Sequence, residues 1–349
     1  MKRFSILIAA LCLCLTGCGK QTTEATAQIF AMDTVMEVAA YGEHAEQAVK
    51  STEKRIEELE NRLSRTKADS LVSGLNRDGS IRHLTYDYWN LIARAKEYRD
   101  ATNGAFDITI APVMDAWGFT GDSFRVPERS ELDELLKHVN SDEIQIQEEP
   151  AHSVTLGEGQ AIDLGGIAKG YTSDWVEQTF RANGIESGKI SLGGNVFVLG
   201  GKPDGSDWRV GIKDPRNESG LAAILSLRDA YAITSGGYER YFEENGKTYH
   251  HIIDPSTGYP ADSGLLSVTV VAADNGPDWA GAGNGAMCDA FSTALFVMGE
   301  EQALDFWRNG GYDFDLVLVT EDGRVVITAG LADRLEEVKD SGYTYETVS

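Results

Sequence analysis

A glycine-rich segment in the middle of the chain has the composition of an anion-binding turn. It runs from Asp163 to Tyr171 as Asp-Leu-Gly-Gly-Ile-Ala-Lys-Gly-Tyr, between an expected strand and an expected helix. Backbone N–H groups at the start of a helix favour a phosphate group, and Lys169 would add a positive charge in the first turn. The glycine spacing matches neither the P-loop nor the dinucleotide-binding pattern. A tight turn with a surface lysine is therefore the alternative interpretation.

Asp289 and Thr293 are four residues apart in an expected helix, so their side chains lie on one face. A carboxylate and a hydroxyl are the hard oxygen ligands that Mg²⁺ prefers, and Mg²⁺ completes its coordination with water and substrate phosphates. The helix is expected to begin at Asp289. Asp289 could therefore instead cap the helix N-terminus, with backbone partners near Ser292.

Two further segments contain residue types that could take part in catalysis or binding. His250 and His251 end an expected strand just before a turn at residues 254–260, and a histidine can act as a general base near neutral pH. A structural histidine is the more common case at a strand end. Residues 105–107, which are Ala, Phe and Asp, follow the end of a helix and place an aromatic ring and a carboxylate in a loop. The start of a strand with an exposed aspartate is the alternative.

The elements that must position these residues are a mixture of helices and strands. They do not alternate regularly along the chain, which argues against a doubly wound parallel sheet. The pattern predicts the α+β class, with mixed, largely antiparallel sheets and packed helices in a single large domain. Periodicity predicts helices over residues 44–64, 86–102, 130–139, 169–183, 289–298 and 300–309, a strand over 29–41, a hairpin over 143–159, and strands over 189–199, 208–213, 222–227, 230–234, 248–253, 265–273 and 315–328.

The composition of the chain limits the kinds of molecule that the protein can bind. The chain has 349 residues, 42% of them hydrophobic, and a net charge of −24. Such a chain can bury a sizeable core, and its acidity argues against DNA or RNA as a partner because a phosphate backbone would be repelled. A small phosphate ligand held locally by a cation stays compatible with this charge.

The N-terminus is typical of an exported lipoprotein. Lys2 and Arg3 precede an apolar run that is too short to span a bilayer. This run ends in Leu-Thr-Gly-Cys18, which resembles a bacterial lipobox, although an ordinary signal peptide is the alternative. We expect a signal peptide over residues 1–17, a lipidated tether over 18–28 that begins at Cys18, and a folded domain over 29–340. Cleavage before Cys18 would leave Cys288 as the only free thiol, so no intramolecular disulfide is expected.

The order of the motifs resembles the FAD:protein FMN transferase family, also called the ApbE family, over about residues 29–332. The resemblance implies an ApbE-like fold related to the T-fold. It also implies a frequent location as a lipid-anchored protein on the extracytoplasmic (periplasmic) face of the cell membrane. The motifs that carry it are Met-Asp-Thr at 32–34, Gly-Ala-Phe-Asp at 104–107, the segment 163–171, Ser-Leu-Gly-Gly-Asn at 191–195, Thr-Ser-Gly-Gly at 234–237, His-Ile-Ile-Asp-Pro-Ser-Thr-Gly at 251–258, and Asp-Ala-Phe-Ser-Thr-Ala-Leu-Phe at 289–296.

The resemblance also implies roles for individual residues. Thr66 stands where relatives often have an aromatic residue against the flavin or adenine, and Ser292 stands where some relatives have a second acidic metal ligand. Asp289 and His251 are the candidates for the general base. FAD would contact Met32, Thr66, Ala105, Phe106, Asp107, Asp163, Lys169 and Ile253, while Mg²⁺ would be bound by the carbonyl of Gly166 and by Asp289, Ser292 and Thr293.

The implied activity is Mg²⁺-dependent transfer of FMN from FAD to a Thr or Ser hydroxyl of a target flavoprotein, with release of AMP. The expected acceptor is an extracytoplasmic protein such as a subunit of a membrane redox complex. The sequence leaves three alternatives open: a Mg²⁺-dependent FAD pyrophosphatase that yields FMN and AMP, a non-catalytic FAD-binding lipoprotein, and a solute-binding lipoprotein without metal. One departure from the family is a longer segment over residues 274–286, which could be a mobile flap or a tolerated surface insertion.

Overall fold

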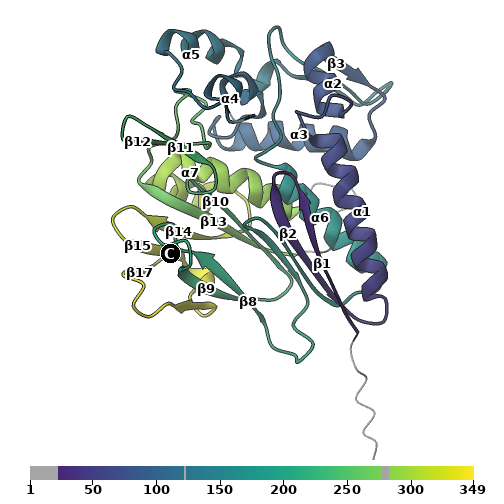
Figure 1. Ribbon diagram of the computed structural model, residues 1–349, viewed down its shortest axis with the longest axis vertical. Helices are drawn as coiled ribbons and strands as arrows, with labels where there is room; N and C mark the ends of the chain where they lie inside the picture. Colours follow the sequence, from purple (N-terminus) through teal and green to yellow (C-terminus); the bar gives the residue numbers. More distant parts are fainter. Residues whose placement is uncertain (1–22, 122, 275, 277–282) are drawn as a thin grey trace, which may run out of the picture.

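A nine-stranded sheet forms the centre of the protein (Figure 1). The structure, a computed structural model, describes residues 23–121, 123–274, 276 and 283–349. Neighbouring strands of this sheet are antiparallel except for the last pair, β15 and β17, which is parallel. This arrangement confirms the predicted α+β class. In sheet order the strands are β1 (Glu24–Ala31), β2 (Thr34–Tyr41), β6 (Ser187–Leu192), β7 (Asn195–Leu199), β10 (Ala230–Gly236), β13 (Leu265–Ala273), β14 (Asp315–Thr320), β15 (Arg324–Thr328) and β17 (Thr344–Val348).

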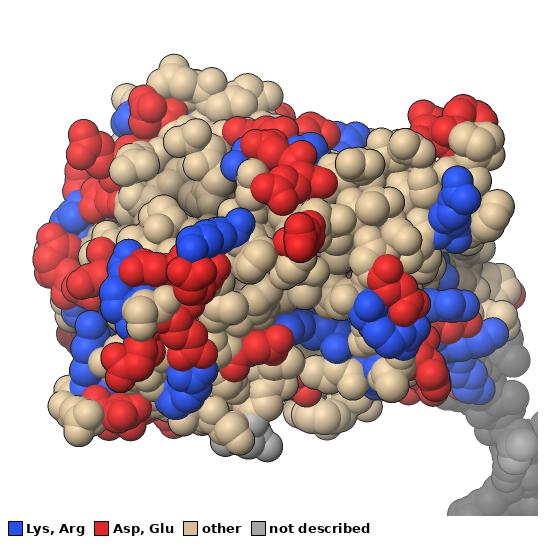
Figure 2. Space-filling model, turned by 90° about the horizontal axis from the view of Figure 1, so that it is seen from above, with Lys and Arg blue, Asp and Glu red and all other residues tan. Residues whose placement is uncertain are grey.

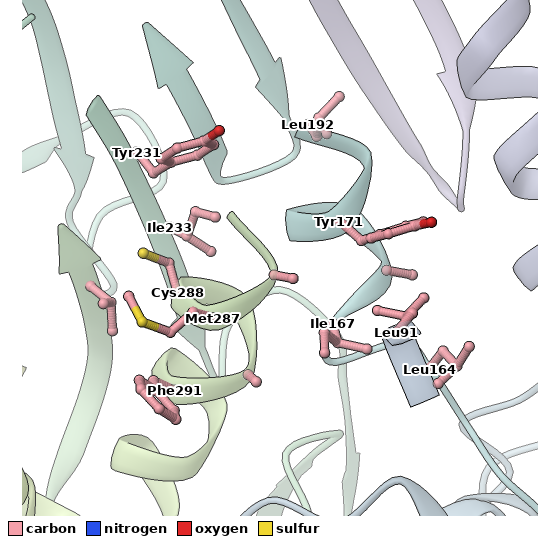
Figure 3. Close-up of a cluster of buried hydrophobic side chains, with 14 of the residues drawn as sticks. Leu91, Leu164, Ile167, Tyr171, Leu192, Tyr231, Ile233, Met287, Cys288 and Phe291 are labelled. Carbon is pink, nitrogen blue, oxygen red and sulfur yellow. The ribbon is translucent and has the colours of Figure 1, made fainter. Parts of the chain in front are cut away.

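Three helices cover one face of the sheet: α1 (Ala45–Leu63), α6 (Ala168–Ala182) and α7 (Asn284–Asn309). Figure 3 shows Tyr171 of α6 and Phe291 of α7 in a cluster of buried apolar side chains, and both side chains are fully buried. At Gly299, where φ is 78° and ψ is 172°, α7 is interrupted. The two helices predicted for 289–298 and 300–309 are therefore the two parts of α7 on either side of this break.

A small three-stranded sheet covers the other face. It consists of β16 (Leu335–Glu337), β9 (Leu221–Leu227) and β8 (Trp208–Lys213) in that order. Strand β8 alternates buried and exposed residues, as expected for a strand with one face on a core. Its buried side chains pack against valines of β7, β13, β14 and β15. The domain thus has three layers, with the main sheet between helices and a smaller sheet.

The remaining described elements form a cap beside one end of the main sheet (Figure 1). Trp117 ties α4 to the loop that follows β12, because its Nε1 donates a hydrogen bond to the carbonyl oxygen of Gly258 at 2.7 Å. Strands β4 and β5 pair as an antiparallel hairpin, which confirms the hairpin predicted for 143–159. The cap elements are α2 (Leu71–Asp78), β3 (Ser80–Arg82), α3 (Tyr86–Ala101), α4 (Ala111–Trp117), α5 (Arg129–Leu135), β4 (Gln145–Gln147), β5 (Ser153–Thr155), β11 (Tyr241–Glu244) and β12 (Lys247–His250).

The single strand predicted for 29–41 is wrong, because the chain forms a hairpin there. Met32 and Asp33 make the turn with φ values of 50° and 59°, a conformation that glycine or asparagine usually signals. Glu60 of α1 supports the turn, since its Oε1 accepts a hydrogen bond from the Met32 N–H at 3.1 Å. The tether prediction is also wrong for residues 24–28, which belong to β1.

The runs predicted as single strands over 189–199 and 315–328 are likewise hairpins, β6–β7 and β14–β15.

Figure 2 shows one face of the molecule, on which acidic and basic side chains are mixed. Within the part of the chain that the structure describes, no helix has the length and apolar character needed to cross a membrane. The predicted signal peptide and Cys18 lie outside the described residues, and so does most of the loop predicted over 274–286.

Candidate functional site

A cavity of about 640 Å³ lies at the junction of the cap, the β1–β2 turn and the N-terminal part of α6. Its volume is within the range of sites that hold cofactors and other small molecules. Among the predicted site residues that the structure describes, Ser292 is the only one that is not in its lining. The cavity is lined by Met32, Thr66, Ala105, Phe106, Asp107, Asp163, Gly166, Lys169, His251, Ile253, Asp289 and Thr293, among others.

The glycine-rich turn forms one wall of this cavity. The Asp163 Oδ1 accepts a hydrogen bond from the Gly165 N–H at 2.8 Å, which closes the turn before α6 begins at Ala168. Lys169 then lies in the first turn of the helix and lines the cavity. The predicted turn and helix are confirmed. The strand expected before them does not form, because residues 160–163 are irregular. The Asp163 N–H instead donates a hydrogen bond to the carbonyl oxygen of Ile108 at 2.7 Å.

Asp289 lies inside α7 and not at its start. The helix begins at Asn284, so the alternative in which Asp289 caps the helix is wrong. Asp174 of α6 fills that role, since its carboxylate accepts hydrogen bonds from the N–H groups of Gly283, Gly285 and Ala286 at 2.8–3.0 Å. A carboxylate placed there satisfies the free donors of the helix end and its positive dipole.

The helices α6 and α7 cross at two glycines, and this close contact positions Asp289. A Cβ added to Gly170 would lie 2.1 Å from the carbonyl oxygen of Gly285 and 2.6 Å from the Asp289 Cβ. Because the backbones approach so closely, the Gly170 N–H can donate to the Asp289 Oδ2 at 2.8 Å. The carboxylate is thereby held on one side by α6 while it lines the cavity on the other.

Thr293, Asp289 and Gly166 all line the cavity, and Thr293 lies close to Gly166. A Cβ added to Gly166 would lie 3.6 Å from the Thr293 Oγ1 and 3.1 Å from the Phe106 ring, so any larger residue would occupy this space. The donor set of carboxylate, hydroxyl and carbonyl oxygens fits Mg²⁺. Nowhere among the described residues do three or more His, Cys, Asp or Glu side chains gather in a metal-binding cluster. A cation here would therefore need ligands from a substrate or from water.

Burial shifts the acid–base behaviour of both candidate bases. Burial raises the pKa of Asp289, while the positive charge of Lys169, the Gly170 N–H and the nearby Asn195 amide oppose the shift. Burial and the charge of Lys169 lower the pKa of His251 to about 4. His251 is therefore a neutral imidazole at pH 7. Its Nδ1 lies 3.2 Å from the carbonyl oxygen of Arg240, and a carbonyl only accepts, so the proton is on Nδ1 and Nε2 keeps its lone pair.

Ser292 is fully buried behind the cavity. Its Oγ donates to the carbonyl oxygen of Asp289 at 2.9 Å and lies 2.8 Å from the Oγ of Ser235. Ser235 lines the cavity and lies 3.1 Å from the Thr293 Oγ1. Of the four predicted metal ligands, Ser292 is thus the one that the cavity does not reach.

Asp107 lines the cavity, but its carboxylate accepts hydrogen bonds from residues of the cap. It accepts hydrogen bonds from the N–H and hydroxyl of Thr109 at 2.9 and 2.6 Å, and from the N–H of Ser141 at 3.1 Å and its hydroxyl. These bonds join the loop at 105–107 to the segment before β4. The predicted contact of Asp107 with FAD stays a prediction.

The sequence did not point to Arg65, the most connected cation of the cavity wall. Its guanidinium bonds to Asp163 at 3.2 Å, and to Asp115 and Thr120 at 2.7 Å each. It stands two residues after the end of α1 and next to Thr66, the position where relatives often have an aromatic residue. Ser235 and Arg240 also line the cavity. The sequence assigned a role to neither of them, although Ser235 belongs to the Thr-Ser-Gly-Gly motif.

Together these features define a class of protein with one polar cavity that can hold a phosphate-bearing ligand next to a group of hard oxygen atoms. Lys169 and Arg65 supply positive charge, Phe106 an aromatic surface, and Asp289 and Thr293 the oxygen atoms. Comparison with known proteins identifies the family. The profile of the ApbE family matches residues 32–316, and the chain belongs to that family.

Relatives and solved structures agree with this assignment. The chain is 32% identical over 307 residues to the FAD:protein FMN transferase of Treponema pallidum, covering 83% of this chain and 82% of that protein. It is 34% identical over 294 residues to one from Klebsiella pneumoniae, covering 82% and 86%. The crystal structure of the ApbE protein of Thermotoga maritima superposes with a TM-score of 0.78 at 31% identity, covering 91% of this chain and 97% of that one. The apo form of the flavinyl transferase ApbE of Pseudomonas stutzeri superposes with a TM-score of 0.73 at 27% identity, covering 86% and 92%.

Proposed function

We propose that this protein is an FAD:protein FMN transferase, which moves FMN from FAD to a Thr or Ser hydroxyl of a target protein and releases AMP. The observation that supports the proposal most directly is the convergence of Lys169, Asp289 and Thr293 on one cavity. These side chains combine a phosphate-binding charge with hard oxygen ligands. The names of the relatives, FAD:protein FMN transferase, point to the same reaction.

In this reaction the acceptor oxygen attacks the flavin-side phosphorus of the FAD pyrophosphate, and the bond from that phosphorus to the bridging oxygen breaks. AMP leaves with this oxygen, and the acceptor proton passes to a base. When bound by Asp289, Thr293 and the Gly166 carbonyl, Mg²⁺ would neutralise charge that develops on the leaving phosphate. Lys169 contributes further positive charge from the first turn of α6.

His251 and Asp289 are the two groups that could receive the proton. The neutral His251 presents the Nε2 lone pair, because its Nδ1 proton is directed to the Arg240 carbonyl. Asp289 has one carboxylate oxygen held by the Gly170 N–H. A base must lie within hydrogen-bond reach of the acceptor hydroxyl, so the bound acceptor decides between the two.

The test is incubation of the protein with FAD, Mg²⁺ and a candidate acceptor flavoprotein, followed by intact mass measurement of the acceptor. We expect a covalent FMN mass that depends on Mg²⁺ and is absent with Asp289→Ala. Free FMN with an unmodified acceptor would instead identify the FAD pyrophosphatase, since water would then be the acceptor. FAD that stays intact under all conditions contradicts both activities and leaves a binding protein.

We also propose that Cys18 is lipidated and anchors the protein to the outer face of the cell membrane. The support is the Leu-Thr-Gly-Cys18 sequence behind a short apolar run. The acceptor would then be an extracytoplasmic protein, such as a subunit of a membrane redox complex. Wild type should appear in the membrane fraction and Cys18→Ser in the soluble extracytoplasmic fraction. Equal membrane association of both proteins would contradict the anchor.

A further inference from the structure

Three hydroxyl groups form a hydrogen-bonded chain that runs from the cavity wall at Thr293 and Ser235 to the buried Ser292. The acceptor of each proton can be worked out in turn. Ser292 donates its one hydroxyl proton to the carbonyl oxygen of Asp289, because a carbonyl oxygen can only accept. The contact of 2.8 Å between Ser292 and Ser235 must then be donated by Ser235. Ser235 has no proton left for its contact of 3.1 Å with Thr293, so the Thr293 hydroxyl is the donor.

We propose that Ser292 and Ser235 are positioning residues that commit the Thr293 proton to Ser235, so that the lone pairs of Thr293 are free for a bound cation. This inference rests on the proposed function, because it assumes a metal beside Asp289 and Thr293. A hydroxyl that is free to rotate would have to be reoriented before it could act as a ligand. The hydrogen-bonded hydroxyls avoid this reorientation on metal binding, because each hydroxyl proton already has an acceptor.

The burial of these residues separates the positioning role from direct contact. Ser292 is fully buried and does not line the cavity, so it can influence a ligand only through its neighbours. The chain also predicts how each substitution acts. In Ser292→Ala, Ser235 regains a proton that it can donate to Thr293, which turns the Thr293 proton toward the cavity. In Ser235→Ala, nothing holds the Thr293 hydroxyl, which rotates freely.

Titration with Mn²⁺ in the presence of FAD and without acceptor measures the effect, with the EPR signal of free Mn²⁺ as the readout. Partners that orient a metal ligand typically contribute about 10–100-fold in affinity. We expect about tenfold weaker Mn²⁺ binding for Ser292→Ala and a smaller loss for Ser235→Ala. Ser235→Thr, which keeps the hydroxyl, should retain wild-type affinity.

The double variant provides the sharpest test. If the serines act in series through Thr293, Ser235→Ala/Ser292→Ala binds Mn²⁺ no more weakly than Ser235→Ala alone, because the harmful donation from Ser235 is gone. Losses that multiply would show that Ser292 acts independently, as a ligand would, and would overturn the inference. Wild-type affinity in both single variants would overturn it as well.

A matched control comes from Ser187 in β6. Like Ser292, it donates its hydroxyl proton to a carbonyl, that of Gly201 at 2.7 Å, but Ser187 is only partly buried and does not line the cavity. Ser187→Ala should bind Mn²⁺ as wild type does. If Ser292→Ala does not fold, the comparison of Ser235→Ala with Ser235→Thr still decides the question. Wild-type protein that binds no Mn²⁺ even with FAD present would instead contradict the metal role in the proposed function.

Discussion

Substitution of Gly170 by alanine should separate the two helices that hold the site. The added Cβ would lie 2.1 Å from the Gly285 carbonyl oxygen, whereas non-bonded atoms pack at about 3.5 Å. The helix α7 must therefore move by about 1 Å, since the opposing atom belongs to the backbone and cannot rotate away. Overpacking of a core costs about 1–3 kcal/mol, and a clash with a backbone atom that cannot rotate away falls in the upper part of that range, about 2–3 kcal/mol.

The gain in helix propensity offsets part of this cost. Alanine is favoured over glycine inside a helix by about 1 kcal/mol, so we expect a net loss of about 1–2 kcal/mol in the free energy of unfolding. Gly74 in α2 is the matched control. It is also inside a helix, but an added Cβ would meet only the end of the Arg77 side chain at 3.8 Å. Gly74→Ala should therefore be stabilised by about 0.5–1 kcal/mol.

Equilibrium unfolding in urea measures both variants against wild type. The expected changes in the free energy of unfolding have opposite signs, although both variants replace glycine by alanine. Gly170→Ala should also bind FAD with Mg²⁺ more weakly, because the shift of α7 carries Asp289 away from the Gly170 N–H. A midpoint of Gly170→Ala at or above that of wild type would refute the steric argument.

Three other predictions concern side chains around the cavity and its supports. His251→Ala should lower turnover and leave the FAD dissociation constant unchanged, and the acidic limb that His251 imposes on the wild-type pH–rate profile should lie near its pKa of about 4 rather than near 6.5. Burial raises the pKa of Asp174 from 3.8 to about 7, so the folded state holds the Asp174 proton more tightly than the unfolded state does. The free energy of unfolding should therefore fall as pH rises between about 4 and about 7. Urea unfolding of Asp174→Asn should show a flatter dependence on pH. Glu60→Ala should lose about 1 kcal/mol of stability with the hydrogen bond to the Met32 N–H and bind FAD more weakly in a fluorescence titration, whereas Glu60→Gln keeps the acceptor and should retain both.

Local patterns were sufficient for the parts of the site that lie within one element. The spacing of Asp289 and Thr293 predicts a shared helix face, and the segment 163–171 predicts a turn that leads into a helix. Both depend only on neighbours in sequence. The fold class could be predicted in the same way, because the lack of regular alternation between helices and strands excludes a doubly wound sheet.

Contacts between distant segments explain what the sequence did not reveal. Gly283 and Gly285 are typical of a loop, yet Gly285 lies within α7 because α6 crosses there, and the capping residue, Asp174, is more than a hundred positions away. The roles of Arg65 and Ser235 depend on partners that only the folded chain brings near. The turn at Met32 was missed because residues other than glycine seldom adopt a positive φ.

The indole of Trp117, which ties α4 to the loop after β12, is a natural fluorescence reporter for the cavity. Its ring is fully buried and lies 6.4 Å from the ring of Phe119, which lines the cavity. Isoalloxazines absorb in the near-ultraviolet range where tryptophan emits, so a flavin bound in the cavity beside Phe119 would accept excitation energy from Trp117. Occupancy can thus be followed without any label as a loss of tryptophan emission, and a Trp117→Phe variant shows how much of that signal originates at this position.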